Sequence, residues 1–154
     1  PHKWIEMIST QLPAELNGNK LFLDKHLGKG YASLEVLQEG LYYIIINATF
    51  NRKIIYDRLP EMEEDHYLVI ISLGDGPTFT HLGSKKYRFK VSDNFSALIV
   101  PPSILSKMVA ESKEKVMLLT IVVEKKWINN NIIGNDENSY IRQMLTAGKP
   151  IPIV

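Results

Sequence analysis

The sequence predicts an all-β protein, either a sandwich or a barrel, in which helix is confined to a short segment near the C-terminal end. Short runs rich in β-branched and aromatic residues recur along the chain, separated by turn residues. Several of these runs alternate apolar and polar side chains, as half-buried strands do. The chain has 154 residues, of which 45% are hydrophobic and 23% charged, so one folded domain with its own core is expected.

The first half of the chain carries the strongest strand signal. Residues 1–19 are expected to form an N-terminal arm, and the glycines of Gly28-Lys29-Gly30 indicate a turn. Residues 31–37 alternate, and the run LYYIIINATF at 41–50 is crowded with β-branched and aromatic side chains. After a turn at Asn51-Arg52, the sequence KIIYDR predicts a further strand.

The second half repeats the pattern with more turns. A strand is predicted at HYLVIISL, whereas residues 74–84 contain three glycines and a proline, which favours a loop or irregular hairpin over a central strand. Residues 85–91 alternate cleanly, and the next strand, FSALIV, ends at the Pro101-Pro102 corner because proline closes a strand. With the last run, KVMLLTIVVEKKW, the total is seven to nine strands.

The C-terminal residues 129–154 are expected to form a polar loop, a short helix and the start of a linker. Asp136 is a plausible N-cap for a helix over 137–147, and Gly148 followed by Pro150 supplies its end. Its apolar face is expected to pack on the sheet. That face consists of Tyr140, Ile141, Met144 and Leu145.

Charge and hydropathy exclude several functional classes. The 18 basic and 17 acidic residues give a formal charge of +1, without the basic surplus that direct phosphate binding requires. The apolar runs are shorter than the roughly 20 residues of a membrane helix. The expectation is therefore a cytoplasmic protein with no membrane partner, and the absence of cysteine agrees with a reducing compartment.

The histidines do not predict a metal centre. A metal-binding barrel of the cupin sort needs about three imidazoles and a carboxylate that converge inside it, with two histidines commonly one residue apart. The chain has only His2, His26, His66 and His81, and no histidine follows the double-proline corner. We therefore expect no metal and no other cofactor.

Signatures of catalysis are also missing from the sequence. It contains no G-x-S-x-G elbow, phosphate loop or cysteine nucleophile. The acidic stretch at 61–65 fits no standard calcium site and is expected to be a solvated loop. The basic stretch KKYRFK is explained by the wet face of a strand. The protein is therefore not expected to be an enzyme.

The order of these elements resembles the N-terminal domain of AraC-type transcription regulators. The resemblance covers residues 20–128 and rests on LGKGYASLEVLQEGLYYIIINATFNRKI, EEDHYLVIISL, KKYRFKVSDNFSALIVPPSI and VMLLTIVVEKKWI. It implies a cupin-like jelly-roll barrel that senses a small-molecule effector, such as a sugar or another metabolite, and forms a homodimer. It also implies that DNA is bound only through a helix-turn-helix domain that follows in the chain and is absent from these residues.

Polar residues on the predicted strands are the candidates for contact with an effector, because a pocket combines an apolar lining with a few hydrogen-bonding groups. On residues 41–50 the even positions are apolar and the odd positions carry the polar groups. The candidate ligand-binding residues are Tyr43, Asn47, His66, Ser72, Tyr87 and Thr120. Trp4 and Trp127 are expected to pack against the strand region.

Two other functions stay open at this point. One is a carbohydrate-binding jelly-roll module, which would present exposed aromatic rings on a flat face. The other is a metal-independent cupin isomerase or epimerase, which would place a base with a perturbed pKa in its cleft.

Overall fold

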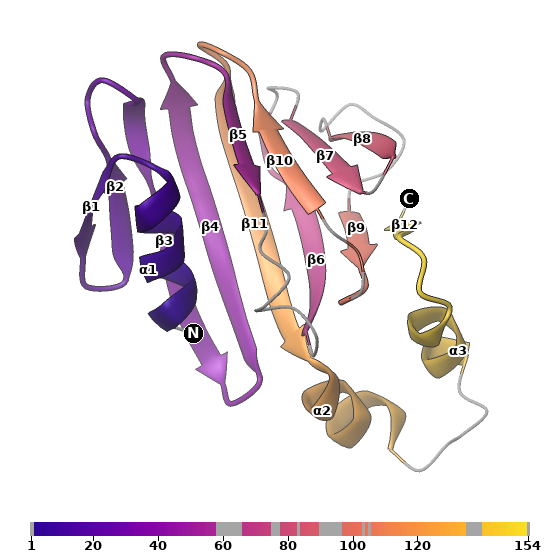
Figure 1. Ribbon diagram of the computed structural model, residues 1–154. Helices are drawn as coiled ribbons and strands as arrows, with labels where there is room; N and C mark the ends of the chain where they lie inside the picture. Colours follow the sequence, from indigo (N-terminus) through magenta and orange to yellow (C-terminus); the bar gives the residue numbers. More distant parts are fainter. Residues whose placement is uncertain are drawn as a thin grey trace.

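The computed structural model describes residues 2–57, 66–74, 78–82, 84–89, 97–102, 104, 106–134 and 140–153, and the fold is an antiparallel β-barrel built from two sheets (Figure 1). The larger sheet has eight strands in the order β1-β2-β3-β4-β11-β6-β9-β12, and the smaller has four in the order β5-β10-β7-β8. The predicted all-β class is therefore confirmed.

The strands of the larger sheet are β1 (Ala14–Asn17), β2 (Lys20–Leu23), β3 (Gly28–Gln38), β4 (Leu41–Phe50), β6 (His66–Ser72), β9 (Ala97–Val100), β11 (Lys115–Glu124) and β12 (Ile151–Ile153). The smaller sheet contains β5 (Ile54–Asp57), β7 (Thr78–Leu82), β8 (Lys85–Phe89) and β10 (Ser106–Ala110). The helical segments are α1 (His2–Gln11), α2 (Lys125–Ile128), the π-helix η2 (Asn129–Ile133) and α3 (Tyr140–Thr146).

The alternation on β4 fixes which face of the larger sheet is the inside of the barrel. Tyr42, Ile44, Ala48 and Phe50 are buried, whereas the odd positions are only half-buried. Residues directly opposite in an antiparallel pair share a face, so the register carries this assignment to the neighbouring strands. The even positions of β4, β6 and β11 therefore point into the barrel.

The core lies between the two sheets, and the helix α1 extends it. One buried cluster joins β4, β6, β9 and β11 to the smaller sheet through residues such as Phe50, Leu98 and Ala110. A second cluster places Ile5 and Ile8 of α1 against β2, β3, β4 and Tyr56 of β5. Helix α1 thus lies on the inner face of the larger sheet, beside the smaller sheet, and completes the second layer (Figure 1).

Several predictions about helix and strand content were wrong. Residues 1–19 contain α1 and β1, so helix is not confined to the C-terminal end. In addition, α2 and η2 follow β11 directly, ahead of the predicted C-terminal helix. The count of seven to nine strands was too low, since twelve are present in the described residues. The apolar positions of α1 are few and alternate with polar residues, so the helical period was not recognised. The residues KKW, which belong to α2, were assigned to the preceding strand.

The Gly28-Lys29-Gly30 segment is not a turn but the start of β3. A Cβ built on Gly28 would lie 2.2 Å from the carbonyl oxygen of Thr49, and one on Gly30 would lie 2.2 Å from that of Asn47. Gly30 also has a φ of +125°. The two glycines are therefore required because the backbone of β4 approaches β3 closely, and not because the chain turns at this point.

The segment 74–84 also differs from its prediction. It contains β7, which lies between β10 and β8 inside the smaller sheet. The glycines flank this strand rather than interrupt it, so the threonine and aromatic residues at 78–82 are free to pair. By contrast, the end of β9 at Val100, directly before buried Pro101, confirms the double-proline corner.

The predicted C-terminal helix is present as α3, and Gly148 follows it with a φ of +63°. Asp136, the proposed N-cap, lies outside the described residues. The expected packing of the apolar face on the sheet is largely wrong, because Tyr140 is 74% exposed and Ile141 is 43% exposed. Only Leu145 of this helix joins a buried cluster, with Tyr67, Val123, Ile128 and Ile133.

Candidate ligand-binding site

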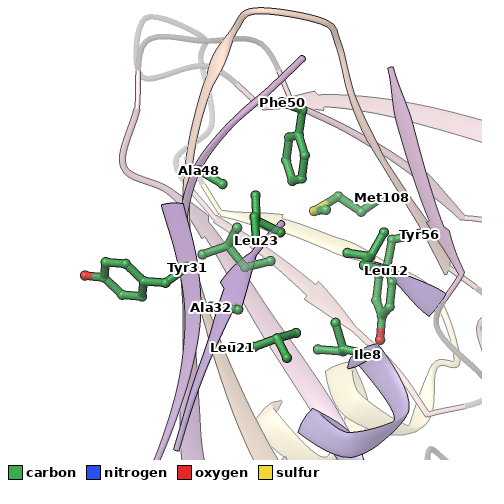
Figure 2. A pocket seen from close by; sticks show the side chains of 11 residues that line it. Ile8, Leu12, Leu21, Leu23, Tyr31, Ala32, Ala48, Phe50, Tyr56 and Met108 are labelled. Carbon is green, nitrogen blue, oxygen red and sulfur yellow. The ribbon is translucent and has the colours of Figure 1, made fainter. Parts of the chain in front are cut away.

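A small cavity lies inside the barrel, between α1 and the inner face of the larger sheet (Figure 2). Its volume is about 30 Å³, room for about one water molecule. It is lined by Ile8, Leu12, Leu21, Leu23, Tyr31, Ala32, Ile46, Ala48, Phe50, Tyr56 and Met108. The lumen is therefore a packed apolar core in this conformation rather than an open pocket.

The cavity is closed on one side by the helix rather than by the barrel wall. Ile8 and Leu12 extend from α1 and the residue following it toward Leu21 and Leu23 of β2 (Figure 2). Tyr56 extends across from β5 with its hydroxyl near Ile8, whereas the ring of Tyr31 points away from the cavity (Figure 2). The side chains around the cavity are apolar except for the hydroxyls of these two tyrosines, so the lumen suits an apolar group.

Four of the six candidate residues face the barrel interior. The register places His66, Ser72 and Thr120 on the inner face of the larger sheet. Tyr87 pairs with buried Thr80 on the smaller sheet and packs against the core. The Ser72 hydroxyl lies 3.4 Å from the carbonyl oxygen of Gly74, to which it donates.

The other two candidates, Tyr43 and Asn47, lie on the opposite face of the larger sheet. Tyr43 pairs with Ile121 and Asn47 with Met117, both outer-face positions of β11. Tyr43 lines a shallow outer groove with Leu37, Ile45, Leu119 and Ile121. The six residues therefore do not form one site, and none of them lines the cavity of Figure 2. Contact of any of them with an effector stays a prediction.

The polar group with the most distinctive surroundings is His66. Its Nε2 lies 3.6 Å from Oε1 of Glu124, and its ring meets that of Tyr42 edge-on at 6.1 Å between centroids. Its Nδ1 is buried and has no hydrogen-bond partner in the part of the chain that the structure describes. The His66–Glu124 pair lies at one end of the barrel interior.

The arrangement of the histidines does not fit a metal centre of the cupin sort. His66 faces inward, but His26 is exposed in the turn before β3, and His81 pairs with exposed Lys107 on β10. Within the described ranges, no three histidine, cysteine, aspartate or glutamate side chains lie close enough to hold a metal ion.

The residues that line the cavity could be identified from the sequence only in part. The apolar even positions of β4 give Ile46, Ala48 and Phe50. Ile8 and Leu12 were missed, although their spacing of four residues, with Ile5 three residues before Ile8, is the signal of an amphipathic helix.

Comparison with solved structures shows the class of fold. The chain superposes on a protein from Photorhabdus luminescens (plu4264) with a TM-score of 0.50 and 12% identity, over 75% of this chain and 90% of that one. It superposes on a Cupin 2 conserved barrel domain protein from Salinispora arenicola with a TM-score of 0.50 and 10% identity, over 76% and 86%. The barrel is therefore a cupin-like jelly roll, as predicted.

A third structure is that of an AraC-like transcriptional activator, CuxR. The TM-score is 0.53 at 9% identity, and the match covers 84% of this chain and 45% of the activator. No protein-family model matches the sequence, and no curated protein sequence matches it. The likeness accordingly defines the fold, and the function has to be argued from the site.

In the described part of the chain, no helix has both the length and the apolar character needed to cross a membrane.

Proposed function

We propose that this cupin-like domain is a sensor module of a transcription regulator, which binds a small apolar effector in the barrel and acts without catalysis. The observation that carries the proposal is the insertion of α1 into the barrel interior. Ile8 of α1 and Leu12, the residue directly after this helix, fill the space where an effector would lie, and neither belongs to a strand of the barrel wall. An effector that takes their place would displace α1.

Displacement of α1 supplies the two states that sensing requires. An effector shifts an equilibrium only by binding one state better than the other. With α1 docked, the cavity of about 30 Å³ is far below the roughly 300 Å³ of a small-molecule site. The effector would bind only the state in which α1 has moved. The match covers 45% of the AraC-like transcriptional activator, and we propose that in this protein the signal passes to a DNA-binding domain.

The expected experiment is a thermal-shift screen of small metabolites on the purified chain, with a chelator added in parallel. A specific apolar compound should raise the melting temperature through linkage, with or without chelator. Stabilisation that disappears with the chelator would indicate a metal-dependent site and would contradict the proposal. Stabilisation by sugars alone would contradict the apolar character of the effector.

Homodimerisation is the second part of the proposed function, and the outer groove supports it. The side chains of Tyr43, Ile45, Leu119 and Ile121 leave an apolar hollow of about 330 Å³ on the outer face.

Light scattering tests the dimer. An Ile121→Lys substitution should convert a dimer into a monomer because it buries a charge in the interface. The matched control is Ile55→Lys on the smaller sheet, where Ile55 is 57% exposed. A monomeric unsubstituted chain at micromolar concentration would contradict this part of the proposal.

One observation favours a second candidate function, a metal-independent isomerase or epimerase. His66 and Glu124 form a pair at the end of the barrel interior, and a histidine oriented by a carboxylate is a common general base. If this pair were catalytic, turnover of a sugar substrate would fall by orders of magnitude in a His66→Gln variant. The carbohydrate-binding alternative gains less support, because the planes of neighbouring Phe22 and Tyr31 are tilted by 51° and form no flat platform.

A further inference from the structure

A larger cavity lies outside the barrel, where the helices that follow β11 meet the outer face of the larger sheet. Its volume is about 310 Å³, at the lower end of the range of small-molecule sites. The lining residues that matter for its chemistry are Tyr67, Lys125, Ile128, Ile133, Arg142 and Leu145. Tyr67 belongs to the outward-facing positions of β6, so this cavity is separate from the lumen.

The inner wall of this cavity is apolar and already packed. Tyr67, Ile128 and Ile133 are between 5% and 7% exposed and form one cluster, against which Leu145 of α3 packs. The Tyr67 hydroxyl donates a hydrogen bond of 3.3 Å to the carbonyl oxygen of Leu145, and burial raises the pKa of Tyr67. The wall therefore holds its shape without a ligand.

The helix that provides this wall has an unusual geometry. η2 is a π-helix of five residues, continuous with α2, and π-helical turns are rare and frequently occur at functional sites. The wider turn brings Ile128 and Ile133 to the same cluster although they are five residues apart. The segment thus presents the side chains of Ile128 and Ile133 to the same cavity, whereas in an α-helix two side chains five residues apart would point in different directions.

The remaining wall carries two positive charges. Arg142 comes from α3 and Lys125 from the start of α2, and neither forms an ion pair with any residue in the described ranges. A guanidinium binds a carboxylate through two parallel hydrogen bonds, and an ammonium adds a point charge. Two cations beside an apolar wall are complementary to an anion that carries a hydrocarbon body.

We propose that this cavity binds a small organic carboxylate, whose charged group contacts Arg142 and Lys125 and whose hydrocarbon body packs on Ile128, Ile133 and Leu145. The ligand would connect α2 with α3 and hold α3 against the barrel. α3 itself contributes only Leu145 to a buried cluster, whereas β12 after it is anchored by pairing with β9, so the carboxylate would fix the position of α3 rather than that of the whole C-terminal segment. This second site acts independently of the lumen.

The probe is hexanoate, and its binding is followed by two-dimensional NMR of the chain. Hexanoate should shift the resonances of Leu145, Ile128 and Ile133 saturably, and amide exchange in α3 should slow. 1-Hexanol has the same carbon chain without the charge, and inorganic phosphate has charge without a carbon chain. Both should bind at least tenfold more weakly than hexanoate.

Variants identify the cations that bind the probe. Arg142→Gln should weaken hexanoate binding about tenfold or more, since hydrogen bonds to a charged group are lost. Lys125→Gln should weaken it by a smaller factor. The matched control is Lys126→Gln, because Lys126 is exposed next to Lys125 but does not line the cavity. Its affinity should be unchanged.

Several results would overturn the proposal. They are the absence of saturable shifts with hexanoate, equal binding of hexanol or of phosphate, and equal affinity in the Arg142, Lys125 and Lys126 variants. An unchanged melting temperature of the free Arg142→Gln chain shows that lost binding is not lost folding. Shifts confined to Ile8 and Leu12 would place hexanoate in the lumen and would likewise reject this site without rejecting the lumen proposal.

Discussion

Replacement of Ile8 by alanine tests whether α1 is an integral part of the barrel core. Ile8 is 4% exposed and lines the cavity of Figure 2. The substitution deletes three carbon atoms, and at about 0.8 kcal/mol for each buried methylene the transfer term is about 2.4 kcal/mol. Partial collapse leaves a void that adds to this cost, so the expected loss is about 3–4 kcal/mol.

Urea denaturation of the Ile8→Ala chain measures this loss as a lower midpoint at unchanged slope. The matched control is Glu6→Ala on the same helix, because Glu6 is exposed and its replacement should change the stability by less than about 0.5 kcal/mol. A loss below about 1 kcal/mol for Ile8→Ala would show that α1 is not packed in the core. The account of a lumen filled by α1 would then be refuted.

The same variant has a functional consequence. The deleted side chain enlarges an apolar cavity, and apolar cavities that stay dry bind small hydrocarbons. Benzene or toluene should therefore raise the melting temperature of Ile8→Ala more than that of the unsubstituted chain. Equal stabilisation of both would place the hydrocarbon elsewhere.

Three further predictions concern the backbone, the outer cluster and pH. Gly30→Ala should lower the free energy of unfolding by more than about 3 kcal/mol, because its Cβ would lie 2.2 Å from the carbonyl oxygen of Asn47. Gly18→Ala has open space around its Cβ and should lower the free energy of unfolding by about 1 kcal/mol, because Gly18 has a positive φ. Equal losses of stability for the two variants in calorimetry would contradict this. Tyr67→Phe should lower the free energy of unfolding by about 0.5–1.5 kcal/mol through loss of the bond to Leu145, and urea titration that shows no change would reject the bond. Burial raises the pKa of Tyr67 above 10.0, so the unfolded chain releases the tyrosine proton at a lower pH than the folded chain does. The free energy of unfolding should therefore fall as pH rises above about 10, and it should fall less steeply in Tyr67→Phe. Parallel profiles of stability against pH for the two chains would argue against the burial of Tyr67.

The strands were predictable because their side-chain period is visible in a single sequence. The alternation on residues 41–50 separated the two faces of β4 without showing which of them faces inward, and Pro101 gave the end of β9. The glycines of β3 were misassigned because a close approach between strands leaves the same local sequence as a turn. Only the partner strand, which is distant in sequence from Gly28, distinguishes the two.

The candidate sites were less predictable because they depend on elements that the local pattern does not place. Tyr43 and Asn47 were chosen as polar groups on a strand, but the apolar residues of β4 are those that face inward, so these two lie outside. The cavity beside Arg142 needs α3 to fold back on Tyr67, a contact over 78 residues. No periodicity in the sequence reports such a contact.

The central claim is that an effector takes the place of α1 inside the barrel. The most direct measurement is the set of NOEs between the methyl groups of Ile8 and the protons of Leu21 and Tyr56, recorded with and without a compound that stabilises the chain. The account predicts that these NOEs are present in the free chain and disappear on saturation. If they persist while the compound is bound, α1 has not moved and the claim is contradicted.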